Sequence, residues 1–263
     1  MTPSRRDFIK TAAATVLALI LPGSFNPVRA KTKAPVAGNA TFSKNNIAHT
    51  LAAKRWAMAV DLTKCTADCT DCIVACHTLH NVPNFGNPKD EIKWIWQEPF
   101  SAVFPGEQHA YSGERLRKLA PPVFCNHCEN PPCVRVCPTG ATFQRADGIV
   151  MMDYHRCIGC RLCMAACPYG ARSMNYRNPR PFIDRINPDF PTRAKGVVEK
   201  CNFCEERLAK GLLPACVEAC RQKALTFGDV EDTRSEIRLL LEKRFSLRRR
   251  AHLGTGPQIY YLL

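Results

Sequence analysis

The chain has 263 residues, which is room for one or two ordinary domains, and 46% of them are hydrophobic. Its formal net charge of +14 is typical of proteins that bind nucleic acid or another acidic partner, and its 16 cysteines are far above ordinary usage. Beyond residue 30 no apolar run is long enough to cross a bilayer, which excludes a membrane-spanning helix there.

The N-terminus has the pattern of a twin-arginine export signal. Arg5 and Arg6 precede an apolar run at 11–21, and small residues lead up to Ala30. The run is shorter than the roughly 20 residues that a transmembrane helix requires, so we expect cleavage after Ala30 rather than a membrane anchor. The twin-arginine route carries folded proteins, so the mature chain is expected in the periplasm, peripherally bound to the membrane through partner subunits.

Every cysteine belongs to one of four groups of four, and each group closes with the same step of three intervening residues. The third group has the full spacing of the bacterial ferredoxin run, including the proline after its last cysteine. The groups are Cys65-x3-Cys69-x2-Cys72-x3-Cys76, Cys125-x2-Cys128-x4-Cys133-x3-Cys137-Pro138, Cys157-x2-Cys160-x2-Cys163-x3-Cys167-Pro168 and Cys201-x2-Cys204-x11-Cys216-x3-Cys220.

This spacing predicts four [4Fe-4S] clusters. Three thiolates on one tight loop hold three irons of a cubane, and the fourth cysteine leads toward a neighbouring cluster. A structural zinc site needs only two close pairs and gives the closing step no role. Disulfides are disfavoured because cysteines two residues apart rarely bridge with good geometry. The first group departs most from the pattern, since its opening step is longer and His77 stands where the proline is expected.

The groups lie in an internal repeat. Alanine recurs four residues after the closing cysteine in three of them, at Ala141, Ala171 and Ala224. Each ligand loop is therefore predicted to follow a short strand, to lead into a short helix and to end in another strand. Asp147-Gly148, between two apolar stretches, predicts a hairpin. The predicted fold class is α+β, with duplicated bacterial-type 2[4Fe-4S] ferredoxin-like modules and irregular loop insertions.

The repeat also predicts the organisation of the chain. Two proline-containing insertions, the first with Trp94 and Trp96, are expected to contact partners, with shielding of clusters as the alternative. The C-terminal stretch has Ile237, Leu240 and Phe245 at helical spacing and predicts a surface helix. The predicted segments are a signal at 1–30, a polar tail at 31–54, an outer module at 55–124 and 197–230 with an insertion at 77–124, an inner module at 125–170, an insertion at 171–196, and a C-terminal helix and tail at 231–263.

The positive charge has an explanation in the predicted cofactors. Loss of the signal, and four oxidised clusters of about 2− each with their thiolates, would leave a net charge of about +3. A nucleic-acid partner is therefore not expected. One basic stretch, formed by Lys243-Arg244 and Arg248-Arg249-Arg250, is either a solvated helix end or a docking surface for an acidic partner or lipid headgroups.

Four histidines lie beside the cysteine groups and could in principle bind metal. Because sixteen thiolates already match sixteen ligand positions, we interpret these side chains as hydrogen-bond partners or covers of the clusters. They are His77, His80, His127 and His155. No nucleophile, paired carboxylate or phosphate-binding loop stands out, so neither a catalytic residue nor a small-molecule substrate is expected.

With these motifs, the sequence resembles the four-cluster ferredoxin-like subunits of membrane-associated oxidoreductases, the relatives of the electron-transfer subunits of dimethyl sulfoxide, polysulfide and tetrathionate reductases. The resemblance covers about residues 56–229 and is most specific across the fourth group, at 200–220. Within that family, stretches at 76–83, 93–96, 125–133 and 253–261 look like the DsrO type, the periplasmic iron-sulfur subunit of DsrMKJOP complexes of dissimilatory sulfur metabolism.

The resemblance implies a non-catalytic electron-transfer subunit with two partners. These are an NrfD-like integral membrane subunit, which exchanges electrons with quinone, and a multihaem cytochrome c. An alternative is the iron-sulfur subunit of a periplasmic molybdopterin oxidoreductase of the tetrathionate or polysulfide reductase type, or of a nitrite-reductase-linked NrfC-type system. The molybdenum-enzyme relatives often travel on the signal of their catalytic subunit, whereas this chain has its own.

The ferredoxin fold predicts which cysteines share a cluster, because three loop thiolates hold one cubane while the fourth reaches across the pseudo-twofold axis to the other. The short connection at 138–156 pairs the second group with the third, which leaves the first group to pair with the fourth. With one module inside the other along the chain, the four clusters would line up as a wire. The predicted ligand sets are Cys65, Cys69, Cys72 and Cys220 (set A), Cys201, Cys204, Cys216 and Cys76 (set B), Cys125, Cys128, Cys133 and Cys167 (set C), and Cys157, Cys160, Cys163 and Cys137 (set D).

Overall fold

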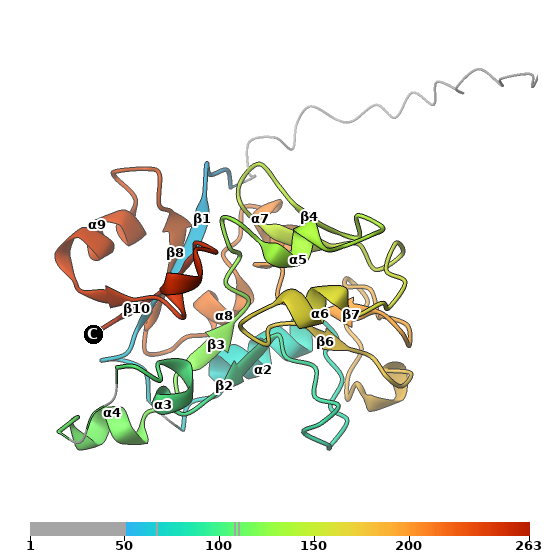
Figure 1. The fold of residues 1–263 in the computed structure, drawn as a ribbon, viewed down its shortest axis with the longest axis horizontal. Helices are drawn as coiled ribbons and strands as arrows, with labels where there is room; N and C mark the ends of the chain where they lie inside the picture. The colour runs from blue at the N-terminus through green and yellow to red at the C-terminus, as the bar shows by residue number, and fades with distance from the viewer. Residues whose placement is uncertain (1–50, 67, 108, 110) are drawn as a thin grey trace, which may run out of the picture. The chain divides into compact units, whose positions relative to one another are not determined.

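The computed structural model describes residues 51–66, 68–107, 109 and 111–263 (Figure 1). The predicted export signal and most of the predicted polar tail lie outside the described residues. The end of that tail is attached to the fold, because the backbone N–H of Leu51 donates to the carbonyl of Leu208 at 3.0 Å and that of Lys54 to the Asp229 carboxylate at 2.7 Å. Within the described part, no helix has the length and apolar character needed to cross a bilayer.

A four-stranded sheet joins segments that are far apart in the sequence. Strand β1 (Trp56–Asp61) pairs antiparallel with β8 (Leu225–Asp229) and parallel with β10 (Ile259–Leu262), and β9 (Ser246–Leu247) extends the sheet beside β10 (Figure 1). All six residues of β1 are buried, as expected for a central strand covered on both faces.

The two faces of β1 pack against different neighbours, following the alternation of side chains along a strand. Met58 and Val60 belong to the main hydrophobic core, which also contains five of the cysteines. Ala57 and Ala59 face a smaller cluster with Ile237. The small alanine side chains allow helix α9 (Glu236–Lys243), which carries Ile237, to lie close to the sheet.

Three two-stranded antiparallel sheets make up the remaining strands of the described chain: β2 (Ile95–Gln97) with β3 (Pro122–Phe124), β4 (Thr142–Gln144) with β5 (Val150–Met152), and β6 (Ser173–Met174) with β7 (Val198–Glu199). The second of these is the hairpin predicted from Asp147-Gly148. Gly148 has φ of 84°, a conformation that favours glycine, and its N–H donates to the carbonyl of Arg145 at 3.1 Å.

The helices are short and most of them begin beside a cysteine. This is the pattern that the repeat predicts, in which a ligand loop runs directly into a helical turn. They are α2 (Asp71–Leu79), α3 (Phe100–Val103), α4 (Glu114–Lys118), α5 (Pro132–Arg135), α6 (Leu162–Ala166), α7 (Glu205–Leu208), α8 (Ala215–Glu218) and α9, with 3-10 turns η2 (Arg180–Phe182) and η3 (Ala251–Leu253).

The first predicted insertion contributes to the core. It contains β2, β3, α3 and α4, and both Trp94 and Trp96 are buried. The Trp94 indole N–H donates to the Glu199 carboxylate at 3.0 Å, and Glu199 forms a fully buried ion pair with Arg193 of the second insertion. Glu199 of β7 therefore contacts a residue of each insertion, and removing one partner of its ion pair would leave a buried charge uncompensated.

The C-terminal region differs from its prediction. Helix α9 ends at Lys243, because Arg244 is extended, with φ of −126° and ψ of 144°, and directs the chain into β9. Phe245 therefore lies outside the helix and is exposed. The stretch predicted as a tail supplies β10, which sequence patterning did not indicate as an inner strand of the sheet.

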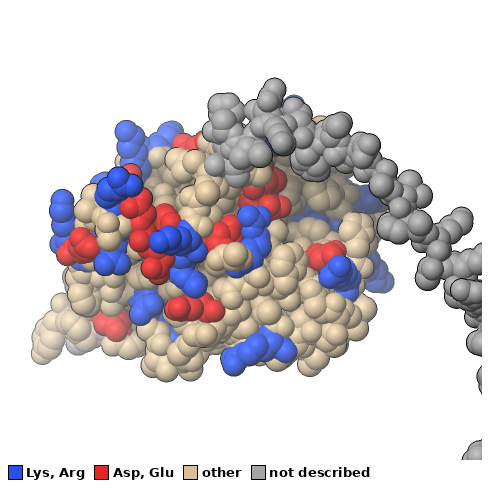
Figure 2. Space-filling model, turned by 90° about the horizontal axis from the view of Figure 1, so that it is seen from above, with Lys and Arg blue, Asp and Glu red and all other residues tan. Residues whose placement is uncertain are grey.

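The basic stretch near the C-terminus is not one open surface. Arg244 pairs with Asp61, Arg248 stacks over Tyr260, Arg249 is buried, and Arg250 donates to the backbone carbonyl of Pro168. On the face that Figure 2 shows, basic and acidic side chains alternate. A continuous positive surface, which nucleic-acid binding would require, is not found on that face.

Asp61 links the end of β1 to Arg244, and this contact gives a prediction. Burial alone would raise the pKa of Asp61, but hydrogen bonds from Arg244 and Thr63 lower it to about 2. We expect Asp61→Asn to lower the free energy of unfolding by about 2 kcal/mol at neutral pH. Because the folded pKa is depressed, the contribution is complete above about pH 4 and is lost as the pH falls toward 2.

Anaerobic urea denaturation of wild type and Asp61→Asn between pH 5 and 7 measures this difference, which should be constant over that range. Asp232→Asn is the matched control, since Asp232 pairs with Arg234 on the surface and should change stability by less than about 0.5 kcal/mol. Equal stability of Asp61→Asn and wild type at pH 7 would contradict the assignment.

Candidate metal centres

The four thiols of set A meet beside the central sheet. Val60 pairs with Leu225 in the antiparallel β1–β8 register. Cys65 follows Val60 by five residues and Cys220 precedes Leu225 by five, so both lie at the same end of this strand pair. Cys72 lies in the first turn of α2, and together with Cys69 these thiols line one hollow. Burial, and then the Cys220 and Cys69 thiols, raise the pKa of Cys65 to about 11.

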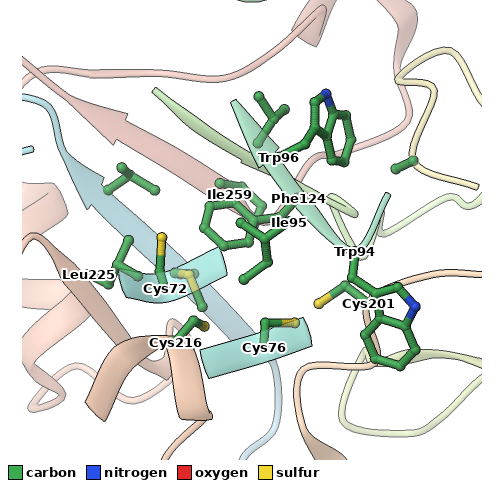
Figure 3. Close-up of a cluster of buried hydrophobic side chains, with 14 of the residues drawn as sticks. Cys72, Cys76, Trp94, Ile95, Trp96, Phe124, Cys201, Cys216, Leu225 and Ile259 are labelled. Carbon is green, nitrogen blue, oxygen red and sulfur yellow. The ribbon is translucent and has the colours of Figure 1, made fainter. Parts of the chain in front are cut away.

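The thiols of set B are buried around the last turn of α2. Cys76 lies one turn beyond Cys72, so a single helix supplies thiols to both sets. Burial, followed by the thiols of Cys201, Cys204 and Cys216, raises the pKa of Cys76 well above its ordinary value. Figure 3 shows the sulfurs of Cys76 and Cys201 directed toward one another, with the Trp94 ring beside them.

Set C is brought together by the loop after β3 and by the segment that follows α6. Burial and then the Cys125 thiol raise the pKa of Cys128 to about 12, and Cys133 and Cys167 also contribute. Burial and then Cys125 likewise raise the pKa of Cys167. The structure therefore places the closing cysteine of the third group beside the loop thiols of the second.

Set D repeats the geometry of set A on the β4–β5 hairpin. Thr142 pairs with Met152, so Cys137 and Cys157, each five residues from that pair, leave the hairpin at the same edge. With Cys160 and Cys163 they line one hollow. Cys160 is the exposed member of this set.

The recurring alanines have a local explanation. The backbone N–H of Ala224 donates to the Cys220 sulfur at 3.2 Å, and the backbone N–H groups of Ala141 and Ala171 also hydrogen-bond to the closing cysteines of their groups. All three alanines are buried. A small side chain lets the backbone turn back onto the sulfur, and amide donors of this kind stabilise a thiolate.

The donor groups fit iron-sulfur clusters. All sixteen cysteines lie within the described residues, none of them forms a disulfide, and the structure gathers them in fours. Burial and mutual repulsion raise the pKa of Cys72 and Cys201 to about 12, so these thiols would stay protonated at neutral pH without a cation among them. Iron supplies that positive charge and releases the protons.

The histidines divide into different environments. His80 Nδ1 hydrogen-bonds the Cys76 carbonyl at 2.9 Å and lies 3.6 Å from the Cys76 sulfur, while its Nε2 lies 2.9 Å from the Glu206 carboxylate, so the ring covers this thiol as predicted. His77 instead hydrogen-bonds the Ile95 carbonyl, and burial lowers its pKa to about 4. His127 stacks on Phe203 and accepts from the Val150 N–H, while His155 is exposed.

Two side chains that the sequence did not indicate contact thiols of set C. Arg172 donates to the Cys133 sulfur at 3.1 Å. Thr255, in the segment before β10, hydrogen-bonds both Tyr169 and Cys128. The signal for Arg172 was available, since it follows Ala171 of the repeat as Thr142 follows Ala141, whereas the contact of Thr255 depends on a distant segment and had none.

Comparisons with known proteins agree with this chemistry. A family model described as a 4Fe-4S dicluster domain matches residues 117–180 and 187–230. The chain is 38% identical to the Hdr-like menaquinol oxidoreductase iron-sulfur subunit 1 of Archaeoglobus fulgidus, over 98% of this chain and 97% of that one. It is 36% identical to protein NrfC of Escherichia coli, over 99% and 95%, and 36% identical to a tetrathionate reductase subunit of Salmonella typhimurium, over 79% and 72%.

These findings confirm the predicted α+β ferredoxin-like fold and the predicted cofactors. The matched stretches contain the second, third and fourth cysteine groups. The first group lies outside them, but α2, which carries two of its thiols, packs against α8 of the fourth group. With sixteen thiols gathered in fours, the protein carries four [4Fe-4S] clusters.

Removal of the iron gives a second prediction. Anaerobically purified protein should hold about 16 iron and 16 acid-labile sulfide atoms per chain. Oxidation with a chelator should then abolish most ordered structure, because cysteines form part of two of the three hydrophobic clusters. Circular dichroism and hydrogen exchange measure the loss, with chelator alone as control. An iron-free protein that keeps its protection from exchange would contradict this expectation.

Proposed function

This chain belongs to the family of iron-sulfur electron-transfer subunits of quinone-linked oxidoreductases, and on that premise we propose that it is the DsrO-type subunit of a DsrMKJOP-type complex of dissimilatory sulfur metabolism. It is an electron-transfer subunit rather than a catalytic one. In the proposed role it passes single electrons between a quinone-interacting NrfD-like membrane subunit and a multihaem cytochrome c in the periplasm. The single observation that carries the electron-transfer role is the gathering of the sixteen thiols into four neighbouring sets.

Each of the sets A to D is proposed to ligate one cluster. The support is that in every set the loop thiols have a cysteine of a second group beside them. Cys220 lies with Cys65 in set A, Cys76 with Cys201 in set B, Cys167 with Cys125 in set C and Cys137 with Cys157 in set D. Each group thus lends its closing cysteine to the other member of its module.

The sets have a fixed order of neighbours. Sets A and B share α2, and the Cys72 thiol raises the pKa of Cys76, after burial and the set B thiols. Sets B and C meet where the Cys125 thiol, after burial, raises the pKa of Cys201. Cys133 likewise contributes to the raised pKa of Cys163, which joins sets C and D. The proposed path for electrons is therefore A–B–C–D.

The four sets differ in how far the polypeptide buries their thiols. When bound, the clusters supply one-electron exchange. The chain buries all four thiols of set B, whereas Cys160 of set D is exposed and Cys65, Cys69 and Cys220 of set A are partly exposed. Redox partners are therefore expected at sets A and D, and burial keeps water from the thiolates of set B.

The similarity to a menaquinol oxidoreductase subunit over nearly its whole length supports the quinone link. The whole-length similarity to NrfC favours one second candidate, an NrfC-type subunit of a nitrite-reductase-linked system. A periplasmic molybdopterin oxidoreductase of the tetrathionate type is the remaining alternative. The three differ in their partners, so partner identification separates them.

Cysteine substitutions test the ligand sets. Cys220→Ser should perturb the same paramagnetic centre as Cys69→Ser, because both thiols are assigned to set A, and should leave the centre altered by Cys204→Ser largely intact. Electron paramagnetic resonance of the reduced variants, normalised to iron content, measures which centre changes. If Cys220→Ser and Cys204→Ser alter one common centre, each group closes its own cluster and the interleaved assignment is wrong.

Partner capture tests the proposed complex. Purified from detergent-solubilised membranes, the chain should bring with it a polytopic membrane subunit and covalently bound haem c, and no molybdenum. Haem staining and elemental analysis are the measurements. The matched control replaces Arg5 and Arg6 by lysine, which should leave an iron-loaded precursor in the cytoplasm without haem c. Molybdenum without haem c would favour the molybdenum-enzyme alternative.

A further inference from the structure

Arg172 lies between ligand sets C and D of the inner module. It lies two residues beyond the tight turn that follows Pro168, and its side chain is almost completely buried, with 4% exposure. A buried arginine is uncommon unless its charge is compensated. Among the described residues, no carboxylate forms an ion pair with it.

The partners of Arg172 are sulfur atoms and one hydroxyl. Its Nη2 donates to the Cys133 sulfur of set C at 3.1 Å, and its Nη1 donates to the Thr142 hydroxyl at 3.0 Å. The same side chain lies beside Cys163 of set D, which shares a small buried cluster with Cys133. One guanidinium therefore contacts thiols of two sets.

The repeat makes this arrangement asymmetric. Arg172 and Thr142 follow the equivalent alanines of the third and second groups, and they hydrogen-bond each other across the module. The position equivalent to Arg172 thus holds a short neutral side chain in the second group and a leucine, Leu225, in the fourth. Within this repeat position, a permanent charge is present once, between sets C and D.

We propose that Arg172 raises the reduction potentials of the two clusters held by sets C and D, by fixing one permanent positive charge between Cys133 and Cys163. Reduction adds an electron to a buried anionic site, and a nearby cation stabilises the added charge. A hydrogen bond to the thiolate acts in the same direction. Because the site is buried, counter-ions screen this charge much less than one on the surface.

The inference rests on the proposed ligand sets and makes Arg172 a potential-setting residue rather than a ligand. Arg172→Gln removes the charge and should make one-electron reduction of two of the four clusters less favourable by about tenfold in equilibrium constant, which corresponds to about 59 mV. Arg172→Lys keeps a charge but lacks the planar fork, and should shift the same two midpoints downward by less.

The control is Arg135→Gln, which removes the same charge from an exposed position on α5, two residues after Cys133. Redox titration followed by electron paramagnetic resonance, on protein with a full complement of iron, measures the four midpoints of each variant. The control should leave all four within about a twofold change in equilibrium constant, since surface charge is screened.

The outcomes separate this inference from the proposed function. Unchanged midpoints in iron-replete Arg172→Gln, equal shifts of all four centres, or an equal shift in Arg135→Gln would overturn the role of Arg172 without touching the ligand sets. If Arg172→Gln loses iron, the Arg172→Lys midpoints decide, and iron loss in both variants would assign Arg172 to cluster retention and overturn the proposal. Failure of the ligand sets is seen separately, in the cysteine variants.

Discussion

The rest of the structure depends on one constraint. Two antiparallel strands end in a residue pair, and on each chain segment a cysteine lies five residues past that pair. It occurs twice, where β1–β8 directs Cys65 toward Cys220 and where the β4–β5 hairpin directs Cys137 toward Cys157. In the hairpin the strands are local, so the pair forms from neighbouring residues. In the central sheet the two strands are far apart in the sequence, and the inner module lies between them along the chain.

Burying so many thiolates requires compensation of their negative charge. Different polar groups of the chain provide it at different sulfurs. Backbone amides beside the repeat alanines act on the closing sulfurs, His80 contacts Cys76, and Arg172 contacts Cys133. Around set B the protection is mostly apolar. Trp94 stacks on His80 and its indole N–H donates to Glu199, which forms the buried ion pair with Arg193. For this part of the insertions, shielding of a cluster is the role that the packing supports.

The sequence was most informative where short spacing determines geometry. The cysteine groups, the Asp147-Gly148 hairpin and the alanine four residues after each of three closing cysteines all follow from contacts between near neighbours. The fold class and cofactors could therefore be predicted. Sequence alone could not show that β10 pairs with β1, because a four-residue apolar segment has no partner-specific pattern and its register depends on residues about 200 positions away.

The site shows the same division. Spacing indicated all sixteen thiols, whereas the reach of Arg172 depends on how two repeats are placed across a module axis. Phe245 matched a helical pattern but lies beyond the helix, since Arg244 is drawn to Asp61 and the chain continues as a strand. In both places a tertiary contact overrides what the local pattern alone predicts.

The parallel pairing of β1 with β10 has a consequence for how this protein is made. A ribosome releases β1 early, yet its parallel neighbour at Ile259–Leu262 and the Gly254–Gln258 segment that covers Asn126–Asn130 are synthesised about 200 residues later. Until then an apolar strand has an unsatisfied edge, which is a hazard for aggregation. The central sheet can therefore be completed only after these late segments have been synthesised.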